Sequence, residues 1–277
     1  QLGCPSTPEL LVLEAQDAAR AGDARLAQQR FEALLAQQPD DSHVQISFAT
    51  QLLTVGEPER AEALCAAILN RDPLDQLALA YRGTAWHLMN DAREQWLLDY
   101  ERMVVPVEVP VPEGFADSER FFGALSDALE GLHHTHAQPI EQGVRGGTQT
   151  NGFLFRLKHP LLITLGQQIR KATASALQHF PEDKDHPFWS RNPIAPSGDG
   201  LRFAGAWSVR LSDQGYHANH IHPQGWISSA LYIALPDEVR GGEGSAGHIQ
   251  FGSPLQELDL QLPPKKTVKK SSLIFIL

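Results

Sequence analysis

The chain has 277 residues, of which 42% are hydrophobic and 20% charged, and this composition excludes disordered and collagen-like proteins. No apolar run approaches the roughly 20 residues that a transmembrane helix needs, and the net charge of −10 excludes a generally basic surface. We therefore expect neither a membrane nor a nucleic-acid partner. Two cysteines are too few for a disulfide framework, which favours a reducing compartment and a cytoplasmic location.

Charge divides the chain into two parts. Residues 1–103 contain 16 acidic and 8 basic residues, and every basic residue among them is an arginine. The rest of the chain contains 17 acidic and 15 basic residues, together with ten of the twelve histidines. Such a contrast predicts two domains.

The first part repeats with a period of 34 residues, the length of a tetratricopeptide (TPR) repeat. The matching pairs are Gly22 and Gly56, Ala27 and Ala61, Leu35 and Leu69, Pro39 and Pro73, and Asp41 and Asp75. The first helices of three hairpins are predicted at Leu10–Ala21, Ser42–Val55 and Gln76–Met89. The last second helix, near Ala92–Met103, fits poorly and reads as a cap or junction. We therefore predict a TPR-like helical repeat domain over residues 8–103.

Stacked helical hairpins bury their apolar faces only against one another. Such an array serves either as a scaffold or as a groove that holds a protein or peptide, and the sequence favours neither use.

The segment that follows changes character. Val104–Pro112 reads VVPVEVPVP, and proline lacks the amide donor that a helix needs, so a linker is predicted over residues 104–117. Two amphipathic helices are then predicted at Ser118–His133 and Pro160–Phe180.

From Arg202 onward the hydrophobic period becomes two, which is typical of strands. The predicted strands are Phe203–Leu211, Gly225–Leu235, Gly247–Gly252, Leu258–Leu262 and Ser272–Leu277. Short strands separated by Gly, Pro and Asp predict a sandwich or barrel.

Three histidines lie between the first two predicted strands, in Tyr216–Pro223. In an extended segment His220 and His222 project from one face, where two imidazoles can bind one transition metal, whereas His217 has the opposite parity. The alternative is a polar loop with solvated histidines. The other histidine run, His133–His136, is predicted to be a solvated helix end.

Ala206–Pro236 resembles the core of a family of 2-oxoglutarate/Fe(II)-dependent oxygenases whose members often carry N-terminal TPR repeats. The residues that carry the resemblance are Trp207, Gly215, His220, His222, Pro223, Ser228, Ser229 and Tyr232. Arg145–Thr150 is similar to an upstream segment of the same family.

The resemblance implies an α+β protein whose residues 118–277 form a double-stranded β-helix, or jelly roll. It implies Fe(II) held by His220 and His222, and 2-oxoglutarate near Tyr232 and Ser228. The implied activity is a dioxygenase that hydroxylates a protein or other substrate, presented by the TPR groove. The alternative is a non-catalytic TPR adaptor with a degenerate barrel.

Two departures from the family pattern qualify this expectation. His222 stands where the family places a carboxylate ligand, and neither the distal histidine nor the basic residue that binds 2-oxoglutarate occurs before Leu277. We therefore expect a chain truncated before the distal histidine, with weak iron binding, little or no turnover and an unpaired strand edge at Ser272–Leu277. His248 is a further candidate for the third ligand.

Overall fold

The computed structural model describes residues 7–133, 143–191, 198–241, 244–268 and 273–276. The chain divides into two compact units. The first comprises Gln1–Asp99, Ile221–Pro223 and Pro254–Leu262, and the second comprises Tyr100–His220, Gln224–Ser253 and Pro263–Leu277. The first unit therefore includes two short segments from the C-terminal half of the sequence.

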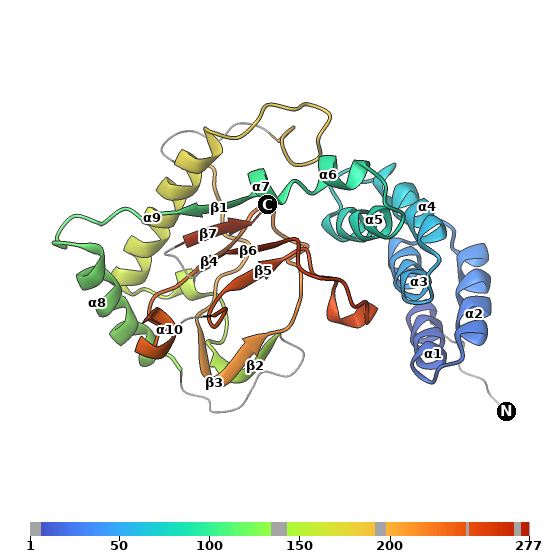
Figure 1. Ribbon diagram of the computed structural model, residues 1–277, viewed down its shortest axis with the longest axis horizontal. Coiled ribbons are helices and arrows are strands. Elements are labelled where there is room, and N and C mark those ends of the chain that lie inside the picture. Colours follow the sequence, from blue (N-terminus) through green and yellow to red (C-terminus); the bar gives the residue numbers. More distant parts are fainter. Residues whose placement is uncertain (1–6, 134–142, 192–197, 242–243, 269–272, 277) are drawn as a thin grey trace. The chain divides into compact units, whose positions relative to one another are not determined.

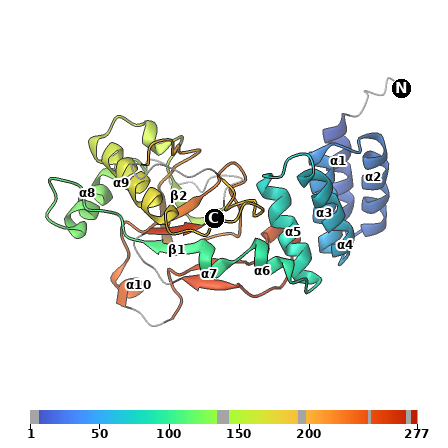
Figure 2. The same ribbon diagram turned by 90° about the horizontal axis from the view of Figure 1, so that it is seen from above.

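The first unit is a row of helices joined by short turns (Figures 1 and 2). Its helices are α1 (Pro8–Arg20), α2 (Ala24–Gln37), α3 (Ser42–Thr54), α4 (Pro58–Leu69), α5 (Gln76–Leu88) and α6 (Arg93–Leu97). Each of α1 to α5 packs against the next helix in the chain. The three predicted first helices are confirmed as α1, α3 and α5. The poorly fitting last helix is broken into α6 and α7 (Tyr100–Met103), and α7 belongs to the second unit.

The period of 34 residues is visible in how the helices begin. Thr7, Asp41 and Asp75 precede α1, α3 and α5, and each side chain accepts a hydrogen bond from the backbone N–H three residues later. These bonds satisfy N–H groups that have no partner within the helix. A position selected for a cap in one repeat therefore recurs as a cap in the next.

The core of the helical unit is apolar and contains small residues where helices approach closely. Ala15 and Ala49 are fully buried, and Gly83 occupies the corresponding position of the third repeat. A Cβ at Gly83 would lie 2.4 Å from Cδ1 of Leu98, so a larger residue would force that side chain to move. Cys65 is buried in the same cluster.

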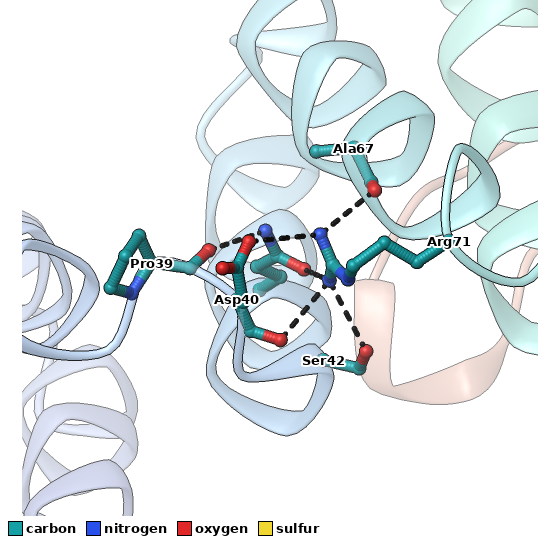
Figure 3. A network of polar contacts seen from close by, with 6 residues as sticks. Pro39, Asp40, Ser42, Ala67 and Arg71 are labelled. Atoms are coloured by element: carbon teal, nitrogen blue, oxygen red, sulfur yellow. Dashed lines mark hydrogen bonds and ion pairs between the residues drawn. The ribbon is translucent and has the colours of Figure 1, made fainter.

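One arginine joins two consecutive repeats (Figure 3). Arg71 follows α4, and its guanidinium donates to the carbonyl oxygen of Ala67 at 2.9 Å and to Oε1 of Gln45 at 2.6 Å. It also donates to the carbonyl oxygen of Asp40 at 3.1 Å. Gln45 is 2% exposed, and its amide in turn donates to the carbonyl oxygen of Pro39 at 2.8 Å. The polar groups of the α2–α3 turn are thus satisfied by the next repeat.

The second unit combines helices with short antiparallel sheets (Figure 1). After α7 its elements are β1 (Val104–Val107), α8 (Ser118–Glu130), β2 (Val144–Gln149), η1 (Leu154–Arg156), α9 (Pro160–Leu177), β3 (Val209–His217), β4 (Ser228–Leu231), α10 (Asp237–Gly241), β5 (Ile249–Phe251), β6 (Lys266–Val268) and β7 (Leu273–Ile276). The predicted helices of this half are confirmed as α8 and α9. No helix in the described part of the chain is long and apolar enough to cross a membrane.

The helix α9 covers a sheet of three strands in the order β1–β7–β4. Ala172 of α9 packs in one cluster with Val107 of β1 and Leu231 of β4. A second cluster joins α9 to α8 through Leu162, Leu165 and Phe121. Val104–Val107, which lies in the predicted linker, is therefore an integral strand of this sheet.

Several strand predictions were wrong in position. The first strand begins at Val209 rather than Phe203, because the preceding residues connect to it without strand pairing. Leu258–Leu262 is not a strand: its first residue ends the short helix η2 (Gln256–Leu258), and the strand β6 lies later, in the lysine-rich segment. Trp207, one of the residues that carry the family resemblance, is 38% exposed.

The expected open edge at Ser272–Leu277 was also wrong. The strand β7 is the middle strand of its sheet, since Phe275 pairs with Val105 of β1 on one side and with Ser229 of β4 on the other. The described strands form this sheet and the pairs β2–β3 and β5–β6, and among them no closed barrel is present. The fold is a mixed α+β arrangement of packed helices followed by a β-rich region.

Candidate functional site

The predicted metal-binding segment leaves the end of an antiparallel ribbon formed by β2 and β3. At that end His217 pairs with Val144. The register shifts between Arg145 and Gly147, and Gly146 has a φ of 64°. This irregularity is a bulge, which bends the strand and changes the direction of the side chains beyond it.

The bulge explains one glycine of the predicted motif. A Cβ at Gly215 would lie 2.1 Å from the carbonyl oxygen of Gly146, so another residue would displace the backbone. The hydroxyl of Ser212 donates to the same carbonyl at 2.7 Å. Beyond the strand, the N–H of Ala218 donates to the carbonyl oxygen of Gly143 at 2.7 Å. Hydrogen bonds therefore hold the chain in place both before and after His217.

The structure places the ring of His217 close to that of His220. The centroids of the two rings are 5.5 Å apart and the rings are inclined by 34°. Nδ1 of His220 lies 2.7 Å from the carbonyl oxygen of Ala218. Because a carbonyl only accepts, Nδ1 carries the proton and Nε2 carries the lone pair of the neutral ring. A Cβ at Gly143 would come within 3.1 Å of this Nδ1.

The surroundings of His217 favour its neutral form. Loss of hydrating water lowers the pKa of His217 below 6.5, although part of the residue remains exposed to solvent, and the nearby His220 lowers it further. A neutral imidazole is the form that binds a metal, and a carbonyl that holds Nδ1–H orients Nε2 for that role.

His222 is half-buried and groups with the first unit, whereas His220 groups with the second. Residues 218–222 form no strand, so the alternation on which the pairing of His220 with His222 was based does not apply. The assignment of these two residues as joint ligands stays a prediction.

The two residues expected near 2-oxoglutarate lie along β4. Ser228 opens the strand and pairs with Ile276 of β7. Tyr232 follows the strand and packs in an apolar cluster with Val104, Phe251 and Val268, where burial raises the pKa of its hydroxyl above 10. Tyr232 therefore keeps its proton at neutral pH and can act as a hydrogen-bond donor.

The sequence-based prediction for one histidine was wrong. His133, expected on a solvated helix end, is half-buried, and its two ring nitrogens lie 2.9 Å from Oγ1 of Thr148 and 3.1 Å from Oγ of Ser208. It thus connects the end of α8 to β2 and to the residue before β3. No local pattern signals these partners, and the rest of the run, His134–His136, lies outside the described residues.

The imidazole nitrogens of this region suit a transition metal, but they do not form a complete set of ligands among the described residues. Imidazole nitrogens are ligands for iron, and His220 has the backbone partner that orients a ligating ring. Within the described ranges, no group of three or more His, Cys, Asp or Glu side chains is arranged to hold a metal ion. The placement of His248, just before β5, adds no third ligand to such a group.

One known family is similar to this region. Residues 205–273 match the model of a family described as "Putative 2OG-Fe(II) oxygenase", a stretch that contains β3 to β6, His217, His220 and His222. The family implies Fe(II) and 2-oxoglutarate as cofactor and co-substrate. Comparisons of the chain with curated proteins and with solved structures found no match.

Proposed function

We propose that this protein is an Fe(II)/2-oxoglutarate-dependent dioxygenase that hydroxylates a protein or other organic substrate. The observation that carries the proposal is the hydrogen bond between Nδ1 of His220 and the carbonyl oxygen of Ala218, within the segment that matches the oxygenase family. This bond selects the tautomer that a metal ligand requires.

In this proposal His220 and His222 are the metal ligands contributed by the histidine segment, and Ser228 and Tyr232 contact 2-oxoglutarate. When bound, iron and 2-oxoglutarate supply the oxidising chemistry that transfers one oxygen atom of O₂ to a substrate C–H bond, with succinate and CO₂ as co-products. The part of the chain is to orient His220, to hold His217 neutral beside it, and to offer the protonated hydroxyl of Tyr232 as a donor.

The wider assignments belong to the same proposal. We take the helical unit as a TPR array because its caps at Thr7, Asp41 and Asp75 repeat every 34 residues. We take the β-rich region as an elaborated double-stranded β-helix, and the buried thiol of Cys65 agrees with a reducing, cytoplasmic setting. The helical unit would bind the protein or peptide substrate.

The test measures metal binding by single histidine variants of the full chain. Co(II) replaces Fe(II), and its visible absorption spectrum reports binding. His220→Ala and His222→Ala should each abolish the spectrum, and His217→Ala should leave most of it. His43→Ala, in the helical unit, is the control. If His217→Ala and His220→Ala abolish binding while His222→Ala does not, the pair is His217 and His220, and the assignment of His222 is wrong.

A non-catalytic TPR adaptor is the second candidate. It is favoured by the finding that no group of three potential ligands is assembled among the described residues. Production of succinate from 2-oxoglutarate and O₂ distinguishes the two candidates. Turnover that depends on His220 supports the dioxygenase, whereas metal binding without any turnover supports the adaptor.

A further inference from the structure

A loop of the β-rich region supplies part of the helical unit. The strands β5 and β6 pair antiparallel, with Phe251 opposite Lys266, and the N–H of Lys265 donates to the carbonyl oxygen of Phe251 at 2.8 Å. The loop between them is thus closed at its base. Its central residues, Pro254–Leu262, belong to the first unit, and η2 within them contacts α3.

Leucines provide the apolar part of this contact. Leu258 is fully buried in the same cluster as Phe48 and Tyr81, and Leu255 and Leu260 pack against that cluster while remaining partly exposed. Leu258 therefore lies in the interior of the helical unit, and Leu255 and Leu260 pack at the edge of the same cluster.

A carboxylate provides the polar part. The hydroxyl of Tyr81, on α5, donates to Oε1 of Glu257 at 2.5 Å, and the hydroxyl of Thr50, on α3, donates to the oxygen of Tyr81 at 3.2 Å. Tyr81 is 2% exposed, and its burial raises the pKa of the phenol well above 10, so the hydroxyl remains a donor. A buried donor of this kind requires an acceptor, and Glu257 is the acceptor present.

The segment resembles a bound peptide more than an element of the helical unit. Its hydrogen bonds from Leu258 N to Leu255 O and from Asp259 N to Gln256 O are internal to it, and Asp259 adopts a φ of 47°. Side chains of Glu257 and Leu258 make the contacts with the helices. Contacts of this kind can be reproduced by a separate peptide that carries the same side chains.

We infer that Thr50, Tyr81 and the apolar side chains that bury Leu258 form a recognition site, the α3–α5 site, for short peptides of the pattern Leu-x-Glu-Leu-x-Leu. The segment Leu255–Leu260 is its resident occupant, and a partner must displace it. This inference rests on the proposed partner-binding role of the helical unit and names the class of partner. Residues 1–103 carry a net negative charge, so bulk charge does not attract an acidic peptide, and recognition depends on the hydroxyl and the leucine pocket.

The probe is a fluorescein-labelled synthetic peptide with the sequence PLQELDLQL, residues 254–262, titrated against the full chain by fluorescence anisotropy. The resident segment competes with it as an intramolecular ligand. The double variant E257A/L258A removes both resident anchors and should bind the peptide roughly tenfold more tightly than the wild type. Adding Tyr81→Phe, which keeps the ring and removes the hydroxyl, should weaken this binding by roughly tenfold.

The matched control is V111A/E113A, which removes an apolar and an acidic side chain from an exposed segment of the second unit and should bind the peptide as weakly as the wild type. Equal binding by wild type and E257A/L258A, no binding by a folded E257A/L258A, or equal binding of a scrambled peptide would each overturn the inference. If far-UV circular dichroism shows the double variant unfolded, hydrogen exchange of the wild type decides. Excess peptide must then accelerate exchange in residues 254–262, and unchanged exchange counts against the site.

Co(II) binding through His220 is measured on the same samples. A peptide that fails to bind while the cobalt spectrum is normal refutes the recognition site and leaves the oxygenase proposal intact. A peptide that binds while the cobalt spectrum is absent supports the recognition site and counts against the oxygenase proposal.

Discussion

Gly56 and Asn90 lie 34 residues apart and share a left-handed backbone conformation, with φ values of 80° and 53°. Each residue closes the turn after a first helix, since Gly56 N donates to the carbonyl oxygen of Leu53 and Asn90 N to that of His87. Gly22, with a φ of 83°, occupies the corresponding position in the first repeat. Glycine and asparagine are the residues that adopt this conformation most readily, so the repeat is expressed in backbone geometry as well as in sequence.

The first prediction concerns this turn. Gly56→Ala should destabilise the protein by about 1–2 kcal/mol, because a Cβ is strained at a φ of 80° even though no atom lies within 4 Å. The measurement is urea unfolding followed by circular dichroism. The matched control is Gly123→Ala in α8, where φ is ordinary and the space is also open, and which should stabilise by about 0.4–1 kcal/mol. Similar effects of the two changes would argue against backbone strain at Gly56.

The second prediction concerns the helix caps. Asp41 accepts from the backbone N–H groups of His43 at 2.8 Å and Val44 at 3.1 Å. Asp41→Ala should therefore cost about 1 kcal/mol, while Asp41→Asn, which retains an acceptor, should cost less. Asp127→Ala on an exposed position of α8 should change stability little. Equal losses from Ala and Asn at position 41 would indicate that charge, rather than capping, is responsible.

The third prediction concerns the arginine that joins two repeats. Arg71→Ala should destabilise by about 1–2 kcal/mol, because it leaves Gln45 and the Asp40 carbonyl without their donor. Arg71→Lys should recover little, since one ammonium cannot reproduce the spread of the guanidinium contacts. A double-mutant cycle with Gln45→Ala should give a coupling of about 0.5–1.5 kcal/mol. Additive losses would show that the Arg71–Gln45 contact at 2.6 Å contributes nothing of its own.

The fourth prediction concerns pH. Burial raises the pKa of the Cys65 thiol from 9.0 to about 12. A group whose folded pKa is raised contributes stability that is fully present below its unfolded pKa and is lost as pH rises through the folded value. Stability should therefore fall between about pH 9 and 12, and Cys65→Ala should show a shallower decline over the same range. The readout is urea unfolding of both proteins at several pH values.

The same burial makes the Cys65 thiol unreactive. In a Cys4→Ala background, a thiol reagent at pH 8 should label the native protein far more slowly than the urea-unfolded protein. Rapid labelling of the native form would show that the α3–α4–α5 packing around Cys65 opens readily.

The N-terminal helices could be predicted from the sequence because their determinants are local. Helix periodicity, a cap such as Asp75 and a turn residue such as Gly56 all act within a few residues of where they occur. Repetition then multiplies the signal, which is why α1, α3 and α5 begin and end close to their predicted limits.

The position of the histidine segment could be predicted from the sequence, but the arrangement of its side chains could not. Its motif located the region that matches the oxygenase family. The assignment of His220 and His222 as joint ligands stays a prediction, yet strand alternation did not predict that the rings of His217 and His220 lie close together. The reason is the bulge at Gly146 and Gly215, which bends the chain, and the bond from Ala218 N to the Gly143 carbonyl. Those partners lie about 70 residues away in sequence, so alternation within the segment carries no information about them.

Sequence alone therefore determined the two-part organisation, the helical repeat and the region that carries the histidines. Only the tertiary structure decided where the strands lie, that β7 is the middle of its sheet, and that Leu258 belongs to the helical core. Short apolar runs such as Leu258–Leu262 suit a strand or a buried loop equally well until a partner surface is available. Here that surface is formed by α3 and α5, and the hydrogen bond between Tyr81 and Glu257 spans 176 residues of sequence. Burial of a leucine against a distant helix outweighs the weak local preference for a strand.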